Sequence, residues 1–500
     1  MTLLESEVHK RLKNLLRERK GYTWPHYLTM ARLVSRSLRL RSSALMQTGN
    51  DLSRYYLSYL IPALLSPDEV NLVVPTSGQS WFMDSLLPNL QTELGTNKPI
   101  FLNSQGPDGS LSIISIQFWL KEFLFKPKSV FSTKTVTLID QADQLETHIR
   151  ELLSINISAK DWLKLLETFP QEQEKINTIR SKVTHAIFAH PSNPYNCYLF
   201  DDVEYRHLFG LLLHLQTLKP LPLAWQQFQQ QAQSPNQVVS SAVDRQRGSF
   251  LLRTSPLEVS SLLNKILLQQ PVVLMGGFLD THKDILTYRT SLGLGNILSV
   301  TFSPNRNREQ VNLYTPKYMP LPNTPEFQGS LLQEICRLIR LMLNQKNLIV
   351  ILVEDVPLKA QIATFLAAEF GSMVQVENKT TFNSGVLVAG WAFWIAHQTD
   401  FAVPELLIMA TLPIPSPENP LVAAQISYYK KQRQDWFGLY LLPKALNSIQ
   451  RAVMPLRESQ GIVALLDSRV LLRGYGKDIL KSLAPYAQTN YLDQEFLLLR

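Results

Sequence analysis

Cysteine is almost absent from this chain. Only Cys197 and Cys336 occur among 500 residues, and they stand far apart. Two thiols are too few for a zinc ribbon or a four-cysteine iron–sulfur cluster within the chain, and they provide no disulfide framework. The lack of such a framework favours a reducing compartment. The sequence therefore predicts a cytoplasmic protein without an iron–sulfur cluster.

Long hydrophobic runs are missing as well. A membrane-spanning helix needs about 18 consecutive apolar residues, and no stretch approaches that length. Residues 1–20 are heavily charged and contain no apolar signal core. These absences predict a protein without a membrane partner.

The composition that remains is that of a core-forming protein of more than one domain, with 45% hydrophobic and 18% charged residues. A net charge of +8 permits a nucleic-acid partner without requiring one. Residues 30–40 have helical periodicity, and Arg32, Arg36 and Arg39 fall on one face at spacings of four and three. A solvated surface is the favoured interpretation of that face, and phosphate contact is the alternative.

One stretch organises the second half of the chain. Prolines at positions 413, 415 and 417 exclude a helix and a central strand. They follow the apolar run 406–411, which has the pattern of a buried parallel strand. A stiff loop is therefore expected at the end of a strand, where open α/β sheets place their sites.

Further motifs follow this loop in order. They are Leu-Pro-Lys-Ala at 442–445, a Gln-x6-Arg spacing at 450–457, and an apolar run ending in Asp-Ser-Arg at 467–469. The ordered series resembles the last motor domain of the DinG/XPD-type superfamily-two helicases.

The resemblance implies an α/β fold with two RecA-like motor domains, each a parallel sheet with helices on both faces, and a helical insertion in the first. The predicted parts are 1–149 (N-terminal helices and first RecA-like domain), 150–245 (arch-like insertion), 246–299 (first domain, continued) and 300–500 (second RecA-like domain). The resemblance also implies ATP and Mg²⁺ as cofactors and DNA, single-stranded or forked, as a partner. A protein partner is a further alternative.

The first nucleotide motif is expected after the apolar run 72–74. A phosphate-binding loop needs small residues, a Lys that reaches the phosphates and a Ser or Thr that holds Mg²⁺. By resemblance this loop consists of Thr76, Ser77, Gly78, Gln79 and Ser80, with Ser80 toward the metal. Gln79 occupies the lysine position and brings no charge. Without the resemblance, the stretch is typical of an ordinary strand–turn–helix junction.

The adenine-reading positions have also changed. In the family an Arg and a Gln recognise the adenine of ATP. Aligned on Pro25 and Met30, these positions hold Trp24 and Tyr27.

The second nucleotide motif follows the apolar run 136–139. Asp140 is placed to bind Mg²⁺ by resemblance, in a segment that reads Asp-Gln-Ala-Asp where the family has Asp-Glu-Ala-His. Gln141 therefore replaces the glutamate that takes a proton from the attacking water, and a neutral amide cannot take that proton.

The last motif loses its arginine finger. Gln450 and Arg457 keep the family spacing and are predicted nucleotide contacts, but Met454 stands where the finger belongs. Such an arginine contributes roughly 10³ to 10⁵ in rate. Arg457 is expected to meet phosphate or to pair with Glu418 or Asp467.

Two further segments are candidates for nucleic-acid contact. Gly276 and Gly277 keep the backbone path of a family motif but lose its hydroxyl groups. Phe393 and Trp394 keep an aromatic pair that could stack on a base. A core position is the favoured interpretation of that pair.

The insertion is predicted to be helical. Its histidines show no metal-ligand spacing, so ordinary surface or core roles are expected for His148, His185, His190, His207 and His214. After the insertion, Ser255 is predicted to cap a helix that runs from Pro256 to Gln269.

Three hypotheses remain. The favoured one is a nucleic-acid-binding helicase homologue whose hydrolysis of ATP is weak or lost, with a non-enzymatic scaffold as its extreme form. The second is a working, divergent ATP-dependent DNA helicase, which would need substitute charges such as Lys98, Asp84 or Asp143. The third, an unrelated α/β protein, is disfavoured because the matches keep the family's order from Trp24 to Pro485.

Overall fold

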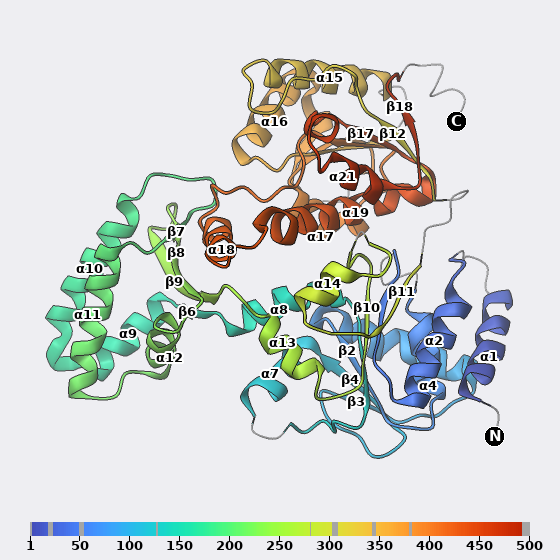
Figure 1. Ribbon diagram of the computed structural model, residues 1–500. Helices are drawn as coiled ribbons and strands as arrows, with labels where there is room; N and C mark the ends of the chain where they lie inside the picture. The colour runs from blue at the N-terminus through green and yellow to red at the C-terminus, as the bar shows by residue number, and fades with distance from the viewer. Residues whose placement is uncertain are drawn as a thin grey trace. The chain divides into compact units, whose positions relative to one another are not determined.

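The computed structural model describes residues 3–18, 24–49, 55–126, 129–280, 282–302, 309–342, 347–379 and 383–492, without the side chains of Ser77 and Glu458. The chain divides into two compact units (Figure 1). Unit 1 comprises Met1–Leu145, Asn264–Ile414 and Leu441–Arg500, and unit 2 comprises Glu146–Leu263 and Pro415–Tyr440.

Unit 1 contains two seven-stranded sheets, and every strand pair in both sheets is parallel. The first has the order β11-β1-β10-β5-β2-β4-β3. Its strands are β1 (Ala44–Gln47), β2 (Val70–Val74), β3 (Ile100–Leu102), β4 (Leu111–Ser115), β5 (Val136–Ile139), β10 (Val272–Gly276) and β11 (Leu298–Thr301).

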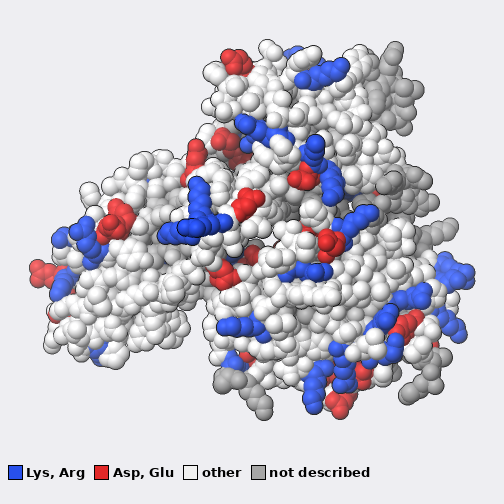
Figure 2. Space-filling model, viewed as in Figure 1, with Lys and Arg blue, Asp and Glu red and all other residues white. Residues whose placement is uncertain are grey.

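Three helices pack together and against the first sheet in one hydrophobic core. α1 (Leu4–Glu18) buries Val8, Leu12 and Leu15, whose spacings of four and three place them on one face. The other two are α2 (Tyr27–Leu40) and α4 (Leu57–Leu65). Lys and Arg side chains gather over the α1–α2 end of the molecule, with acidic side chains among them (Figure 2).

The remaining helices near the first sheet follow the strands that precede them. α5 (Gln79–Trp81) continues through a π-helical turn into α6 (Leu87–Leu94). α7 (Ile116–Phe125) begins at the end of β4, where the hydroxyl of Ser115 accepts a hydrogen bond from the N–H of Phe118. The last is α14 (Leu286–Ser291).

The second sheet has the order β14-β15-β13-β16-β17-β12-β18. Successive residues of β13, the third strand in this order, enter different cores: Val350 belongs to one cluster and Ile351 to another. Both faces of this strand are therefore covered. The strands are β12 (Val311–Tyr314), β13 (Leu348–Leu352), β14 (Val374–Val376), β15 (Gly385–Ala389), β16 (Leu406–Met409), β17 (Ile462–Leu465) and β18 (Tyr486–Thr489).

One face is covered by α17 (Trp391–His397), α19 (Leu442–Ser459), α20 (Arg469–Leu472) and α21 (Gly476–Leu483). The other is covered by α15 (Phe327–Met342) and α16 (Val356–Phe370). The proline loop follows β16 as expected. Its first residue, Leu412, donates its N–H to Oδ2 of Asp467 at 2.9 Å, so the loop is tied to the end of the neighbouring β17.

Unit 2 is not purely helical, which corrects the prediction for the insertion. It holds an antiparallel sheet in the order β6-β9-β8-β7. The strands are β6 (Ile155–Ile157), β7 (Cys197–Leu199), β8 (Gln237–Asp244) and β9 (Ser249–Pro256), and the helices are α9 (Ala159–Thr168), α10 (Gln173–Ala189), α11 (Asp202–Leu218), α12 (Leu223–Ala232) and α18 (Pro420–Lys431). The division between the units falls within α8 (Leu145–Leu153) and α13 (Ser260–Leu267).

Two sequence predictions differ from the structure here. Ser255 and Pro256 end β9 and do not open a helix, because β9 pairs along its whole length with β8. The helix begins later, at Ser260, where Oε1 of Glu258 accepts a hydrogen bond from the N–H of Ser261. A domain division at residue 245 would separate the two strands of this hairpin.

α18 belongs to unit 2, although its sequence lies between strands of the second parallel sheet. The side chain of Asn419 caps it by accepting the N–H of Leu421, and Pro420 occupies its first turn. α18 packs on β7 and β8, and the side chain of Gln425 donates to the carbonyl of Leu257 at 2.7 Å.

Over the residues that the structure describes, no helix is both long enough and apolar enough to cross a membrane.

Candidate nucleotide and nucleic-acid site

The carboxyl ends of four adjacent strands meet at one edge of the first sheet. In the order β1-β10-β5-β2, Ile139 pairs with Val73 on one side and with Leu274 on the other. Asp140 therefore emerges level with Val74, the last residue of β2, and one residue before Gly276. This edge is where open α/β sheets bind ligands.

The loop after β2 closes as a single tight turn. The N–H of Gly78 donates to the carbonyl of Pro75 at 3.0 Å, and the N–H of Gln79 donates to the carbonyl of Thr76. Gly78 has a φ of −87°, and an added Cβ would approach only the ring of Phe82, at 3.7 Å. These backbone donors are thus already engaged within the turn.

The side chains of the turn are engaged too. Gln79 is buried, and its Nε2 donates to Oδ1 of Asn103 at 3.2 Å, which also accepts the N–H of Ser115. The hydroxyl of Thr76 donates to Oε1 of Gln117. Ser80 is exposed, and the side chain of Ser77 lies outside the described part of the chain. Position 79 therefore contributes a structural amide contact.

Asp140 is enclosed by two tyrosines. The hydroxyl of Tyr55 donates to Oδ1 of Asp140 at 2.6 Å, and that of Tyr59 donates to Oδ2 at 3.4 Å. Burial raises the pKa of Asp140 to about 7, although the hydrogen bond from Tyr55 works in the opposite direction. Burial also raises the pKa of both tyrosines, so their hydroxyls stay protonated as donors. Both carboxylate oxygens of Asp140 already have protein partners.

The segment after Asp140 turns sharply. Gln141 has a φ of 53°, in the left-handed region that few non-glycine residues adopt. Three residues past Asp140, the buried side chain of Asp143 lies 3.6 Å from the guanidinium of Arg451 in α19. The end of β5 is therefore linked to a helix of the second sheet.

The end of β10 packs closely against the same segment. A Cβ at Gly276 would lie 2.7 Å from Leu279 and 3.1 Å from Oδ1 of Asp143, so only glycine fits there without a shift. The carbonyls of Gly276 and Gly277 accept the N–H groups of Thr48 and Gly49, each at 2.9 Å. Both glycines thus hold the backbone path after β10 and β1 together.

α19 presents one face to these strand ends. Asn447 donates its side-chain N–H to the carbonyl of Phe278 at 2.5 Å, and Arg451 meets Asp143 one turn later. Met454 follows at the next helical spacing and is buried. Arg451 therefore lies three residues before Met454, the position at which the family has its arginine finger. Gln450, beside it, is half-buried.

Arg457 lies elsewhere. It is buried and donates to the carbonyls of Glu309 at 3.2 Å and Leu483 at 3.1 Å, which precede β12 and β18. Burial lowers its pKa to about 10. The expected pairing with Glu418 or Asp467 is wrong, because Asp467 is bound by Arg469 instead. Arg457 sits at the amino-terminal edge of the second sheet.

The aromatic pair is largely core. Trp394 is fully buried and donates its indole N–H to the carbonyl of Ala452 at 3.0 Å. Phe393 is half-buried, and its ring contacts those of His397 and Phe401. Stacking on a base would require Trp394 to leave the core.

An aromatic cluster occupies the adenine-reading positions. The ring of Trp24 is buried and lies edge-on to the rings of Tyr27 at 5.3 Å and Phe302 at 5.6 Å. It also lies 6.5 Å from the ring of Tyr55, the residue that holds Asp140. One buried aromatic group therefore connects these positions with the end of β5.

The substitute charges considered from sequence lie in different places. Lys98 donates to the carbonyls of Ser66 and Asp68, which precede β2, so it lies at the opposite edge of the sheet. Burial lowers its pKa to about 8. Asp84 is exposed, and Asp143 is at the site.

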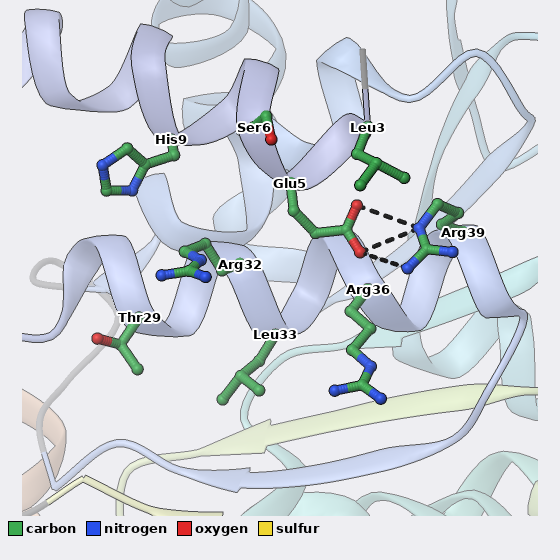
Figure 3. Close-up of a pocket in the computed structure, with 9 residues that line it drawn as sticks. All are labelled: Leu3, Glu5, Ser6, His9, Thr29, Arg32, Leu33, Arg36 and Arg39. Carbon is green, nitrogen blue, oxygen red and sulfur yellow. Dashed lines mark hydrogen bonds and ion pairs between the residues drawn. The ribbon is translucent and has the colours of Figure 1, made fainter. Parts of the chain in front are cut away.

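The arginine face of α2 borders a groove that was not apparent from sequence. Arg32, Arg36 and Arg39 are exposed, as expected for a solvated face, and they line the groove together with residues of α1 (Figure 3).

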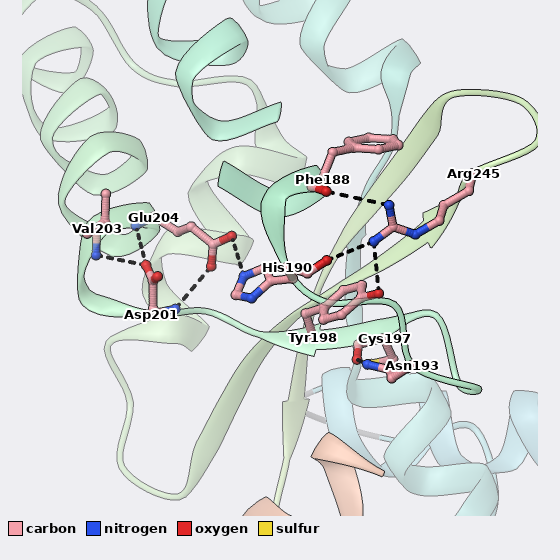
Figure 4. Close-up of polar contacts among 9 residues, drawn as sticks. All are labelled: Phe188, His190, Asn193, Cys197, Tyr198, Asp201, Val203, Glu204 and Arg245. Carbon is pink, nitrogen blue, oxygen red and sulfur yellow. Dashed lines mark hydrogen bonds and ion pairs between the residues drawn. The ribbon is translucent and has the colours of Figure 1, made fainter. Parts of the chain in front are cut away.

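One histidine lies close to two carboxylates in unit 2. Nε2 of His190 lies 3.0 Å from Oε1 of Glu204, and Asp201 completes a group within metal-ligand distance (Figure 4). Asp201 accepts the N–H groups of Val203 and Glu204, and Glu204 accepts the N–H of Asp201. These contacts form a capping box at the start of α11, which explains the group without an ion.

Sequence reasoning missed several residues of the site. Tyr55 and Tyr59 stand four apart, a spacing that places both hydroxyls on one helix face and would have identified them. Arg451 directly follows Gln450 and could have been found on a helical wheel. Asn103 had no comparable signal, because its contact with Gln79 depends on the pairing of β3, β4 and β2.

The fold and this site define the class of protein: two RecA-like parallel-sheet domains with an α+β insertion. A helicase C-terminal domain model matches residues 331–486. The chain is 26% identical over 214 residues to the ATP-dependent DNA helicase YoaA of Haemophilus influenzae, covering 41% of this chain and 33% of that protein. It is 23% identical over 257 residues to YoaA of Escherichia coli, covering 48% of this chain and 40% of that protein.

A solved structure, Xpd4 of S. tokodaii, has the same fold, with a TM-score of 0.61 at 15% identity, covering 93% of this chain and 99% of the other. The predicted resemblance to DinG/XPD-type superfamily-two helicases is therefore confirmed, as is the predicted fold class. The matched regions cover well under half of the curated relatives' own length.

Proposed function

We propose that this protein is a nucleic-acid-binding protein of helicase fold in which ATP hydrolysis is weak or lost. The observation that carries the proposal is the turn after β2. A phosphate-binding loop presents free backbone N–H groups and a lysine to the phosphates. Here the N–H groups of Gly78 and Gln79 donate within the turn, and the side chain of Gln79 is bound to Asn103.

The environment of Asp140 supports the same conclusion. A carboxylate that holds Mg²⁺, directly or through water, must offer free lone pairs. Tyr55 and Tyr59 each occupy one lone pair on the oxygens of Asp140, and burial raises its pKa to about 7, so the carboxyl group lacks a full negative charge at neutral pH. Gln141 offers no base, and Met454 offers no charge for a transferred phosphoryl group. The arrangement therefore does not fit ATP and Mg²⁺ as a hydrolytic pair.

Nucleic acid is the proposed ligand because of the family resemblance and the positive charge. The matched relatives are described as ATP-dependent DNA helicases. The chain carries a net charge of +8, and phosphate contacts from Lys and Arg supply most of the sequence-independent affinity for nucleic acid. DNA, single-stranded or forked, is the partner that the resemblance favours.

One observation favours a second candidate, a divergent helicase that still turns over ATP. Arg451 reaches Asp143 at the edge of the first sheet, the region in which an arginine finger acts. In that case Arg451 would replace the missing finger from one turn earlier in α19.

The test is a titration of the purified protein with a fluorescent ATP analogue and Mg²⁺, with and without single-stranded DNA, together with an assay of phosphate release. We expect DNA binding without DNA-stimulated phosphate release. Turnover that is abolished by Arg451→Ala, and retained by Arg473→Ala at an exposed position, would establish the second candidate instead. Failure to bind any nucleic acid would overturn the proposed function.

A further inference from the structure

The positive charge of this protein is concentrated at one end of its sequence. Residues 1–41 contain ten Lys and Arg and three Glu, which leaves a net +7 out of +8 for the whole chain. The other 459 residues are therefore almost neutral. A charge distribution this uneven marks the part of a protein that meets a polyanion.

The described part of that segment forms a groove between α1 and α2. It has a volume of about 660 Å³ and is lined by Leu3, Glu5, Ser6, His9, Thr29, Arg32, Leu33, Arg36 and Arg39. Figure 3 shows the three arginines on successive turns of one face of α2, with Glu5 of α1 reaching Arg39.

The three arginines differ in their partners. Glu5 neutralises Arg39, with distances of 3.0 and 2.7 Å from its Oε1 to Nε and NH2. That contact lowers the pKa of Glu5. Arg32 and Arg36 are exposed and make no hydrogen bond or ion pair with the described residues. Across the groove, Nδ1 of His9 is buried without a partner among those residues. Two cations, Arg32 and Arg36, thus remain available to an anion.

The spacing suits a phosphate backbone. From Arg32 to Arg39 the helix rises about 10 Å, at roughly 1.5 Å per residue. One nucleic-acid strand places a phosphate about every 3.4 Å along the duplex axis. The whole face therefore spans roughly three phosphates, and Arg32 and Arg36 alone, about 6 Å apart along the axis, span roughly two.

We propose that the α1–α2 groove binds the phosphate backbone of a nucleic acid through Arg32 and Arg36, while Arg39 stays paired with Glu5. This inference rests on the proposed nucleic-acid function and adds a contact distinct from the strand ends of the first sheet. The binding is sequence-independent, because arginine contacts to phosphate carry no base information.

The salt dependence of DNA binding tests this proposal. The affinity of the full chain for labelled oligothymidine and for the matching duplex is measured across a range of salt concentrations. Removing two phosphate contacts with Arg32→Ala/Arg36→Ala should lower the log–log salt slope by about 1.4 for the single strand or about 1.8 for the duplex. Lys160→Ala/Lys164→Ala is the matched control, because both lysines are exposed and four apart on α9.

A second variant works in the opposite direction. Glu5→Gln frees Arg39 and should raise the slope by about 0.7 to 0.9. A melting temperature close to that of the wild type checks that α1 remains docked.

If Arg32→Ala/Arg36→Ala and the lysine control have the same salt slope, the proposed contact in the groove is wrong, while the proposed nucleic-acid binding by the protein still stands. If Arg32→Ala/Arg36→Ala loses binding to anionic vesicles and keeps its DNA binding unchanged, the groove binds a membrane surface and the proposed phosphate-backbone contact is wrong. A wild-type protein that binds no nucleic acid would overturn both the groove and the proposed function.

Discussion

Asp140 shows how single residues adapt the end of β5. A buried carboxyl group is costly when charged unless hydrogen bonds surround it. Tyr55 and Tyr59 provide two such bonds. Even so, burial dominates and leaves the pKa of Asp140 at about 7, well above the value of about 3.9 for an exposed aspartate.

This shift makes stability depend on pH. Below about pH 4 Asp140 is protonated in the folded and unfolded states alike. Between about pH 4 and pH 7 only the folded state keeps the proton, so its stability falls as the pH rises through that window. The loss is on the order of 4 kcal/mol by the time Asp140 ionises in the folded protein.

Asp140→Asn should remove that dependence. The amide oxygen can still accept the hydrogen bond from Tyr55 and carries no charge. We expect the variant to melt at a higher temperature than the wild type at pH 8 and at a similar temperature at about pH 4, as measured by thermal unfolding. Parallel pH profiles for the two proteins would contradict the assigned pKa. Asp84→Asn, at an exposed position, is the control.

At the scale of elements, α19 holds the two sheets of unit 1 together. Its contacts to Phe278 and Asp143 come from residues four apart on one face. Pro455 lies inside the same helix and cannot donate a hydrogen bond to the carbonyl of Arg451. The helix therefore lacks one backbone hydrogen bond near its carboxyl end and keeps a fixed polar face.

A double-mutant cycle measures the main contact of that face. Arg451→Ala, Asp143→Asn and the double variant should give a coupling energy on the order of 1 kcal/mol, because the carboxylate is buried while the arginine is partly exposed. The quantity is the free energy of unfolding of unit 1 in denaturant. Arg473→Ala is the control, and additive effects of the two changes would show that the ion pair contributes nothing.

The whole molecule is two units built from five chain segments. Unit 2 has its own core, centred on Trp162 and Trp225, whose rings lie 4.8 Å apart. The indole of Trp225 donates to the carbonyl of Asp161 at 3.0 Å. Because each unit has a separate core, each is expected to unfold in its own transition.

Trp225→Ala should therefore lower one transition only. Removing a buried tryptophan costs about 3–5 kcal/mol. Calorimetry should show a loss confined to one transition, and hydrogen exchange should accelerate in α9–α12 and in α18 while α19 keeps its protection. Leu223→Ala, two residues earlier and largely exposed, is the matched control. Unchanged exchange in α18 would show that it folds with unit 1.

Much of the architecture follows from local sequence. The apolar runs at 136–139, 348–352 and 406–409 became buried parallel strands, because their hydrophobicity on both faces suits only a covered sheet. The proline loop at 413–417 followed from covalent geometry. β9 was misjudged as a helix start, because Ser-Pro-x-Glu is a local signal that pairing with β8 overrides.

The candidate site likewise has some features that the sequence determines and others that only the fold determines. The sequence by itself determined which charges are missing, since Gln79, Gln141 and Met454 are neutral in any fold. Only the tertiary structure decided what those positions do instead. The tyrosines on Asp140, the amide bond from Gln79 to Asn103 and the reach of Arg451 to Asp143 each join residues at least 24 positions apart. Contacts of that range depend on how strands pair and helices pack, and no local pattern contains them.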